Sequence, residues 1–295
     1  MSSVALGTPG PDVRIDTELV VRLLTDQHPD LAALPVRPAE SGWDNANFRL
    51  GNQLAVRLPR RAAAAPLILN EQTWLPHLQS RLPLPIPSPI RTGAPASGYP
   101  WGWSVVPWLP GTPADLDEPN PSQYRLLVQF LKSLHVTAPS DAPTNAVRGV
   151  PLTQRAGTVE PRLDRLAAAT GLITPRLRAV WNAALEAPID APRTWLHGDL
   201  HPRNLLVDEG IITGVIDWGD VTAGDPATDL ASLWMLFDDP RIREAALGEY
   251  APTQATVLRA QGWAVLFGVI LLDTGRVDNQ RNAIIGERTL RRVCE

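Results

Sequence analysis

The sequence predicts an α+β fold, in which short strands dominate the N-terminal part and helices dominate a longer C-terminal part. A hairpin pattern lies within the first 60 residues, with strand-forming residues on both sides of Gly51-Asn52. Apolar residues recur at helical spacing over residues 121–136 and again over 241–292. At about 150 residues per domain, a chain of this length also has room for two domains.

The first elements are a helix and a hairpin. Apolar residues between 15 and 24 follow a helical period, and Asp16 or Thr17 is suited to cap its start. A small and polar turn over residues 41–48 then leads into the hairpin, whose second strand covers 54–58. This turn contains one glycine, so it is only a weak match to glycine-rich phosphate-binding loops.

A second helix is predicted over residues 62–82. Pro66 fits its first turn, whereas Pro76 is expected to bend it or end its regular part. Residues 101–111 then form an apolar, tryptophan-rich strand that runs into a linker. The tryptophans themselves are equally consistent with plain core packing.

Residues 195–220 hold the polar side chains of greatest chemical interest. Short apolar runs flank Asp208-Glu209-Gly210, which predicts a hairpin. Asn204 and Asp217 lie at its open end, and Asp199 is one loop away. Two carboxylates and an amide gathered in this way suit a divalent cation with oxygen ligands and one free general base. The alternative is a turn-rich loop in which Asp199 merely caps a helix.

His197-Gly198-Asp199-x-His201-x-x-Asn204, followed by Ile216-Asp217-Trp218, resembles the motifs of the aminoglycoside phosphotransferase family. These are small-molecule kinases with a protein-kinase-like fold of two lobes. The resemblance implies Asp199 as the catalytic base, with Asn204 and Asp217 as ligands of Mg²⁺. It also implies an N-terminal nucleotide-binding lobe over residues 1–107, ending in the hinge, and a helical C-terminal lobe over 108–295 with the acceptor site.

The same resemblance implies that ATP or GTP is the phosphoryl donor, bound in the N-terminal lobe. The residues expected to contact the nucleotide or support that contact are Ser41, Asn47, Arg57, Glu71, Val106 and Trp108. For Val106 and Trp108 the expected contacts come from the backbone.

Arg57 is the main departure from the family pattern, which has lysine at this place. Arginine is always charged and can grip phosphate or carboxylate through two donors at once. Arg60 and Arg61 follow closely and are candidates to share the task. Glu71 is the expected partner of the strand cation. The alternatives are a surface arginine on an edge strand and a solvated glutamate on a helix.

Composition excludes several classes of function. A formal net charge of −4 gives no reason to expect a nucleic-acid or anionic-membrane partner. Cys294 is the single cysteine, so neither an internal disulfide nor a cysteine-based zinc site is expected. Residues 1–11 lack the pattern of a secretory signal, and the apolar run 263–272 is too short to span a membrane. A cytoplasmic protein is therefore expected.

The predicted activity is transfer of a phosphoryl group to a hydroxyl of a small molecule, with an aminoglycoside-type or other antibiotic as the leading acceptor. A metabolic alcohol, such as a sugar or an amino alcohol, is the alternative acceptor. The missing lysine also leaves open a catalytically idle member that only binds nucleotide or ligand. Hydrolase chemistry is disfavoured, because no Ser or Cys lies in a recognisable nucleophile elbow.

Overall fold

The computed structural model describes residues 7–40 and 42–295, which form two compact units. The N-terminal unit contains residues 9–110 and 214–219, and the C-terminal unit contains residues 7–8, 111–213 and 220–295. The predicted boundary after residue 107 divides the chain into two lobes, each continuous in sequence. The structure differs in assigning 214–219, the segment that carries Asp217, to the N-terminal unit.

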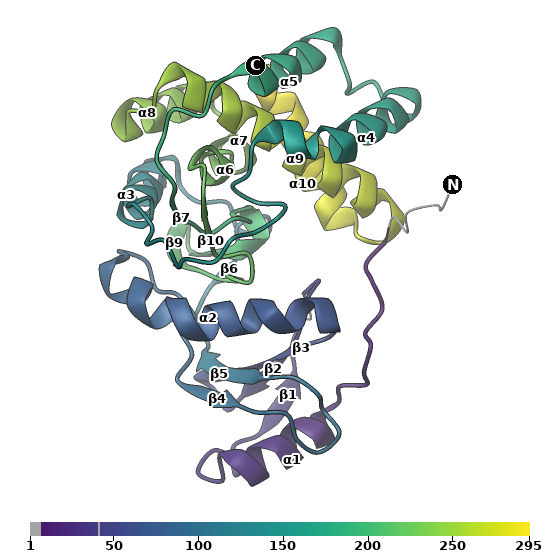
Figure 1. Ribbon diagram of the computed structural model, residues 1–295, viewed down its shortest axis with the longest axis vertical. Coiled ribbons are helices and arrows are strands. Elements are labelled where there is room, and N and C mark those ends of the chain that lie inside the picture. Colours follow the sequence, from purple (N-terminus) through teal and green to yellow (C-terminus); the bar gives the residue numbers. More distant parts are fainter. Residues whose placement is uncertain (1–6, 41) are drawn as a thin grey trace. The chain divides into compact units, whose positions relative to one another are not determined.

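The N-terminal unit is built on a five-stranded antiparallel sheet, with strand order β1-β2-β3-β5-β4 (Figure 1). Its strands are β1 (Val36–Pro38), β2 (Asn45–Leu50), β3 (Leu54–Pro59), β4 (Arg91–Gly93) and β5 (Trp103–Pro107). The predicted hairpin is β2–β3, and Gly51 at its turn has φ +60°, a conformation that glycine adopts without strain.

Helices α1 (Thr17–Gln27) and α2 (Ala65–Leu78) lie on opposite sides of this sheet (Figure 1). The Asp16 side chain accepts the Leu19 N–H at 3.0 Å, so α1 begins at the predicted cap. Helix α2 has proline in its first turn, as predicted. It is shorter than the predicted range 62–82, because single 3₁₀ turns flank it at both ends.

Strand β3 has large apolar side chains on one face and Arg57 on the other. Val56 and Leu58 are buried in a core with Leu23 of α1 and Trp103 of β5. Because successive strand residues point to opposite faces, Arg57 points away from this core. Its side chain instead donates a hydrogen bond to Glu71 of α2, so a cation lies between β3 and this helix.

The C-terminal unit contains two small sheets. Strands β7 (Thr194–Leu196) and β10 (Thr222–Gly224) pair antiparallel, and a three-stranded sheet has the order β6-β8-β9. Its strands are β6 (Thr112–Pro113), β8 (Leu205–Asp208) and β9 (Ile211–Val215). Glu209 and Gly210 both have positive φ, as a two-residue type I′ turn requires. The hairpin predicted here is confirmed.

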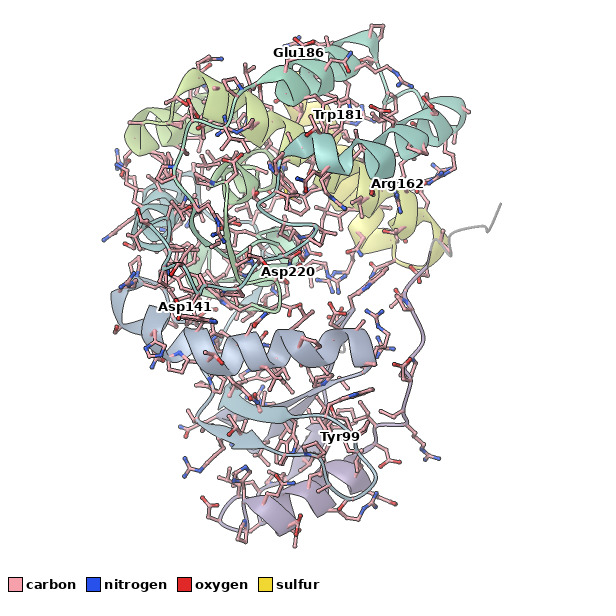
Figure 2. The ribbon with its side chains drawn as sticks, in the orientation of Figure 1. Tyr99, Asp141, Arg162, Trp181, Glu186 and Asp220 are labelled. Atoms are coloured by element: carbon pink, nitrogen blue, oxygen red, sulfur yellow. The ribbon has the colours of Figure 1, made fainter. Side chains whose placement is uncertain are left out.

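The other long elements of the C-terminal unit are helices (Figures 1 and 2). They are α3 (Tyr124–Leu134), α4 (Ala156–Ala169), α5 (Pro175–Glu186), α6 (Ala227–Leu230), α7 (Ser232–Leu236), α8 (Pro240–Tyr250), α9 (Gln254–Asp278) and α10 (Gln280–Val293). The last three confirm the helices predicted over 241–292. Trp181 of α5, labelled in Figure 2, is almost fully buried.

Helix α9 forms the centre of the C-terminal unit and packs against α5, α6 and α10. Among the described residues it alone has the length and hydropathy that would allow a helix to cross a membrane. However, 67% of its most apolar window is buried inside the structure. Such burial is typical of the core helix of a folded domain.

Candidate active site

The loop over residues 197–204, called here the motif loop, follows β7 and is held by a buried carboxylate. Asp229 of α6 is fully buried, and its oxygens accept the backbone N–H groups of His197 at 2.7 Å and Gly198 at 2.8 Å. His135 lies 3.3 Å from the same carboxylate. Hydrogen bonds to a charged group are the stronger kind, so Asp229 fixes the path of the loop.

Gly198 allows the motif loop to turn sharply. Its φ is +85°, and a Cβ placed there would lie 2.6 Å from the backbone oxygen of Asp220. No side chain fits at that distance, and a residue with a Cβ would also be strained at this φ. The glycine therefore lets the loop lie directly against the backbone of Asp220, just before β10.

Asp199 and Asn204 lie together in this loop. The Asn204 amide Nδ2 donates to the backbone oxygen of Asp199 at 2.9 Å and lies 3.5 Å from its Oδ2. His201 Nε2 is 3.4 Å from Asp199 Oδ2, and His201 also caps the short turn Pro202–Asn204 through Nδ1. The two histidines of the motif brace the loop, since His197 Nδ1 accepts the Asp199 N–H at 3.2 Å.

An arginine that the sequence analysis did not single out pairs with Asp199. Arg148 Nη2 donates to Asp199 Oδ1 at 2.8 Å, and its Nε donates to Asp220 Oδ2 at 3.2 Å. Burial opposes ionisation of Asp199, but Arg148 and His201 overcome it and hold the pKa of this carboxyl well below its usual range. Asp199 is therefore ionised at neutral pH. Arg148 is 51 residues away in sequence, in a loop without local periodicity, so no pattern pointed to it.

In the N-terminal unit the structure brings together Arg57, Glu71 and Asp217. Arg57 donates to Glu71 Oε2 at 2.8 Å and to Asp217 Oδ1 at 2.9 Å. Burial opposes its charged form, but these two carboxylates raise the pKa of Arg57. Burial raises the pKa of Glu71 to about 7, although Arg57 acts in the opposite direction. The surface-arginine and solvated-glutamate alternatives are wrong, because both side chains are buried.

Asp217 has a backbone conformation that non-glycine residues rarely adopt, with φ +60°. Its side chain is 42% exposed, so the carboxylate is accessible although one oxygen pairs with Arg57. Gly42, in the turn before β2, lies beside the other oxygen, with an ideal Cβ 3.7 Å from Oδ2. Backbone outliers of this kind concentrate at functional sites.

Two of the remaining residues predicted to contact nucleotide already have hydrogen-bond partners within the N-terminal unit. Asn47 in β2 donates to the Glu40 carbonyl at 3.1 Å. The Trp108 N–H donates to the Gln53 carbonyl at 2.7 Å, so it is already engaged. Ser41 lies outside the described residues.

Val106 is similarly engaged within the sheet. Val105 accepts the Ile90 N–H on one edge of β5. Backbone groups of successive strand residues point to opposite edges, so those of Val106 point toward Ala55 of β3. In this structure the expected base contacts therefore cannot use the N–H groups of Val106 and Trp108 without breaking existing hydrogen bonds.

The residues expected to bind Mg²⁺ fit its chemistry. Asn204 donates through Nδ2, so its Oδ1 remains as an acceptor, and Asp217 supplies a partly exposed carboxylate. In the described part of the chain no group of three or more His, Cys, Asp or Glu could hold a metal ion. In phosphate-transferring sites Mg²⁺ uses one or two protein oxygens together with substrate phosphates and water.

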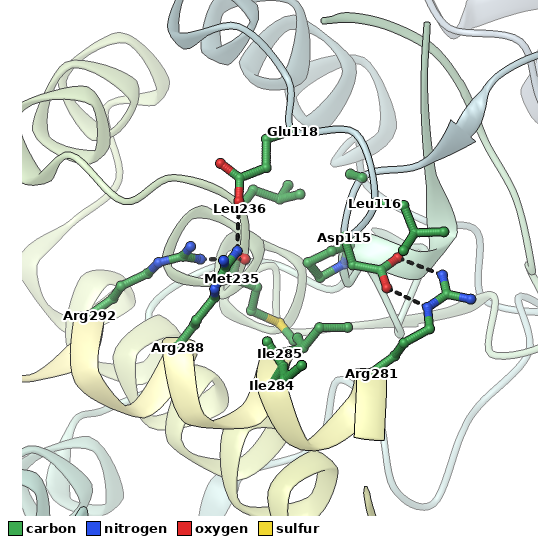
Figure 3. A pocket seen from close by; sticks show the side chains of 12 residues that line it. Asp115, Leu116, Glu118, Met235, Leu236, Arg281, Ile284, Ile285, Arg288 and Arg292 are labelled. Atoms are coloured by element: carbon green, nitrogen blue, oxygen red, sulfur yellow. Dashed lines mark hydrogen bonds and ion pairs between the residues drawn. The ribbon is translucent and has the colours of Figure 1, made fainter. Parts of the chain in front are cut away.

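The C-terminal unit has a cavity of about 120 Å³ beside the motif loop, with Pro202 in its wall (Figure 3). Its apolar part includes Leu116 and Ile284, which are 60% and 46% exposed. Two acidic side chains also line it. Asp115 forms two hydrogen bonds with Arg281, at 2.7 and 2.9 Å, and Glu118 pairs with Arg288 at 2.6 Å (Figure 3).

A second cavity, of about 280 Å³, lies on another part of the C-terminal unit. Residues 144–145 and 148–151 form one wall and residues 223–225 of β10 and its continuation form another. Arg148 and Arg193 both line it. Asp225, which also lines it, is bound by Arg259 through two hydrogen bonds, at 2.6 and 3.1 Å.

Comparison with known sequences places these features in a family. Residues 35–264 match the model of the phosphotransferase enzyme family known as APH. The uncharacterized protein YcbJ of Bacillus subtilis (strain 168) is 25% identical over 211 residues, which are 64% of this chain and 65% of that protein. An aminoglycoside 3'-phosphotransferase of Escherichia coli is 27% identical over 205 residues, 65% of this chain and 68% of the relative. The match to YcbJ thus spans slightly less than two thirds of that protein.

Solved structures show the same fold. The GDP complex of aminoglycoside 2'-phosphotransferase-IIIa has a TM-score of 0.68 at 18% identity, covering 95% of this chain and 99% of that chain. A macrolide 2'-phosphotransferase from Brachybacterium faecium has a TM-score of 0.59 at 22% identity, covering 93% and 97%. The predicted α+β, protein-kinase-like fold is confirmed. Because the family model matches more than half of its length, the chain belongs to the phosphotransferase enzyme family.

Proposed function

We propose that this chain transfers the terminal phosphoryl group of ATP or GTP to a hydroxyl group of a small molecule. The observation that carries the proposal is the motif loop, in which Asp199 is ionised, oriented by Arg148 and hydrogen-bonded to Asn204. Membership of the phosphotransferase enzyme family supports the reaction class. Proteins of similar fold have been solved as complexes with GDP, ADP and ATP, and this supports a nucleotide donor.

In this mechanism Asp199 orients the acceptor hydroxyl and takes its proton. The acceptor oxygen forms a bond to the terminal phosphorus while the bond from that phosphorus to the bridging oxygen breaks. The products are a phosphate ester and a nucleoside diphosphate. A low pKa makes Asp199 a weak base in the ground state, so its contribution is mainly alignment, with proton transfer late in the reaction.

The other charged groups act on the phosphates. Arg57 supplies positive charge, and its two carboxylate contacts hold the guanidinium in one orientation. Asn204 and Asp217 are the proposed ligands of Mg²⁺. When bound, the ion would neutralise part of the phosphate charge.

For the acceptor, we propose a hydroxylated antibiotic and place uncharged compounds ahead of strongly cationic ones. The cavity beside the motif loop supports this order, because both of its acidic side chains already pair with arginine. A polycationic aminoglycoside would have to compete with the two arginines for these carboxylates. The exposed side chains of Leu116 and Ile284 instead favour an acceptor with an apolar surface. A metabolic alcohol is the second candidate class.

The test is a screen of hydroxylated acceptors with Mg²⁺ and either ATP or GTP, followed by mass spectrometry. The panel needs macrolides, aminoglycosides, peptide antibiotics, sugars and amino alcohols. The expected result is an acceptor whose mass rises by one phosphoryl group, with one nucleoside diphosphate formed per product. Nucleotide binding without a mass shift across the panel would instead favour the catalytically idle member.

A further inference from the structure

We propose that Arg148 is a positioning residue that holds the Asp199 carboxylate in the one orientation that suits phosphoryl transfer. This inference rests on the proposed function, since it gives Asp199 the role of base. Arg148 comes from a loop outside the family motifs. Its side chain is only 16% exposed, and its guanidinium carbon lies 5.0 Å from the centre of the Phe267 ring.

The guanidinium bridges two carboxylates through two different nitrogens. Nη2 donates to Asp199 Oδ1 and Nε donates to Asp220 Oδ2. A planar fork bound at two points cannot rotate without losing one contact. Asp220 thereby fixes Arg148, and Arg148 fixes Asp199.

The loop that carries Arg148 is itself anchored. Asn145 Oδ1 accepts the N–H groups of Val147 and Arg148, and its Nδ2 donates to Asp220 Oδ1 at 2.7 Å. The Gly149 carbonyl accepts the Asp225 N–H at 3.0 Å. Asp220 is thus held by two residues of the same loop, which makes the loop a rigid support for the guanidinium.

The loop backbone also touches β10 directly. Gly149 has φ +66°, and a Cβ there would lie 2.9 Å from the Gly224 Cα. The carbonyl of Pro143 accepts both the N–H of Ala223 and the hydroxyl of Thr222. This close packing on both sides of Arg148 leaves little freedom for its Cα to move.

Because Arg148 binds one oxygen of Asp199, the two carboxylate oxygens have different surroundings. Oδ1 is taken by the arginine, whereas Oδ2 faces His201 and Asn204 at the longer distances of 3.4 and 3.5 Å. Oδ2 is therefore the atom left to accept the hydrogen of an acceptor hydroxyl. Without Arg148 the carboxylate could rotate about its side-chain bonds, and the fraction of molecules aligned for transfer would fall.

The experiment measures steady-state transfer for the full chain and three variants. Arg148→Met removes the charge at similar length, and Arg148→Lys keeps the charge without the fork. Arg193→Met is the matched control, because Arg193 is exposed and lines the cavity of about 280 Å³ that Arg148 also lines. Its side chain donates a long hydrogen bond of 3.5 Å to the Ala223 carbonyl. Nucleotide titration of each variant gives the fraction of folded, binding-competent protein.

We expect Arg148→Met to lower kcat by about 10- to 100-fold while the KM for nucleotide changes by less than about twofold. Arg148→Lys should recover part of this loss, and Arg193→Met should match the wild type. If Arg148→Met does not fold, Arg148→Lys decides the question, with a lowered kcat at full nucleotide binding expected.

Three results would overturn the inference. One is a wild-type kcat in Arg148→Met or, where that variant does not fold, in Arg148→Lys. Another is a parallel loss of kcat and nucleotide affinity, which indicates a merely structural arginine. In both cases the proposed function stands, because the wild-type chain is active. A wild-type chain that phosphorylates no acceptor would reject the proposed function, and this inference with it.

Discussion

Arg57 and Glu71 form a buried ion pair, with Arg57 Nη1 2.8 Å from Glu71 Oε2, between strand β3 and helix α2. The second terminal nitrogen of the same guanidinium reaches Asp217 Oδ1 at 2.9 Å. One arginine thus joins the strand, the helix and the segment 214–219. A lysine could carry the charge, but its single ammonium group lacks the planar fork that matches two carboxylates at once.

Replacing Arg57 should separate its structural role from its nucleotide-binding role. Arg57→Met leaves Glu71 buried without its partner, and we expect a loss of about 3–5 kcal/mol in the free energy of unfolding. Arg57→Met/Glu71→Met should recover most of this loss, because a hydrophobic pair can replace a buried ion pair. Both variants should still bind nucleotide more weakly than the wild type. Urea unfolding and calorimetric nucleotide titration measure the two effects, and wild-type affinity in the double variant would exclude Arg57 from phosphate binding.

Stability should depend on pH through Glu71. Its pKa is raised to about 7, above the value of an unfolded glutamate, so the folded chain binds the proton more tightly. The corresponding stabilisation is present below the unfolded pKa and is lost as pH rises through about 7. Relative to Glu71→Gln, which does not titrate, the wild-type free energy of unfolding should fall by about 1–3 kcal/mol between pH 5 and 8. A constant difference would show that Arg57 keeps Glu71 ionised throughout.

Gly198→Ala should damage the motif loop. The substitution strains the backbone at φ +85° and forces Cβ against the Asp220 carbonyl, so we expect a cost of about 1–3 kcal/mol and a lower transfer rate. Gly171→Ala is the control, since a Cβ at Gly171 meets no atom within 4 Å. It should change stability by less than about 0.5 kcal/mol. Equal effects of the two substitutions would argue against a special conformation at Gly198.

Asp229→Asn should weaken the hydrogen bonds that hold the backbone of the motif loop. An amide has one acceptor oxygen in place of two, so the N–H groups of His197 and Gly198 can no longer both bond to it as before. We expect a loss of about 1.5–3 kcal/mol in the free energy of unfolding and a lower kcat. Asp164→Asn, at an exposed ion pair with Arg178, serves as the control and should have little effect. Full activity in Asp229→Asn would contradict the anchoring role.

Sequence reasoning reached the features that depend on local chemistry. The cap at Asp16 and the turn at Glu209-Gly210 each follow from residue types at short range. The spacing of Asp199 and Asn204 also predicted that they lie together, because they are five positions apart in one loop.

What sequence reasoning missed depends on contacts between distant segments. Arg148 reaches Asp199 from a loop whose proline, serine and asparagine content indicates only irregular structure. The sequence also did not show that the Trp108 N–H donates to the Gln53 carbonyl or that Val106 pairs with Ala55 of β3. The neighbouring strand that the backbone groups of a residue face depends on the strand register, and a single sequence does not specify the register to one residue.

The most direct test of the proposed activity compares the wild type with Asp199→Asn, using the acceptor found in the screen. We expect the variant to bind nucleotide with near wild-type affinity while kcat for transfer falls by about 10²- to 10⁴-fold. Transfer at the wild-type rate in Asp199→Asn, with nucleotide binding intact, would contradict the assignment of Asp199 as the catalytic base.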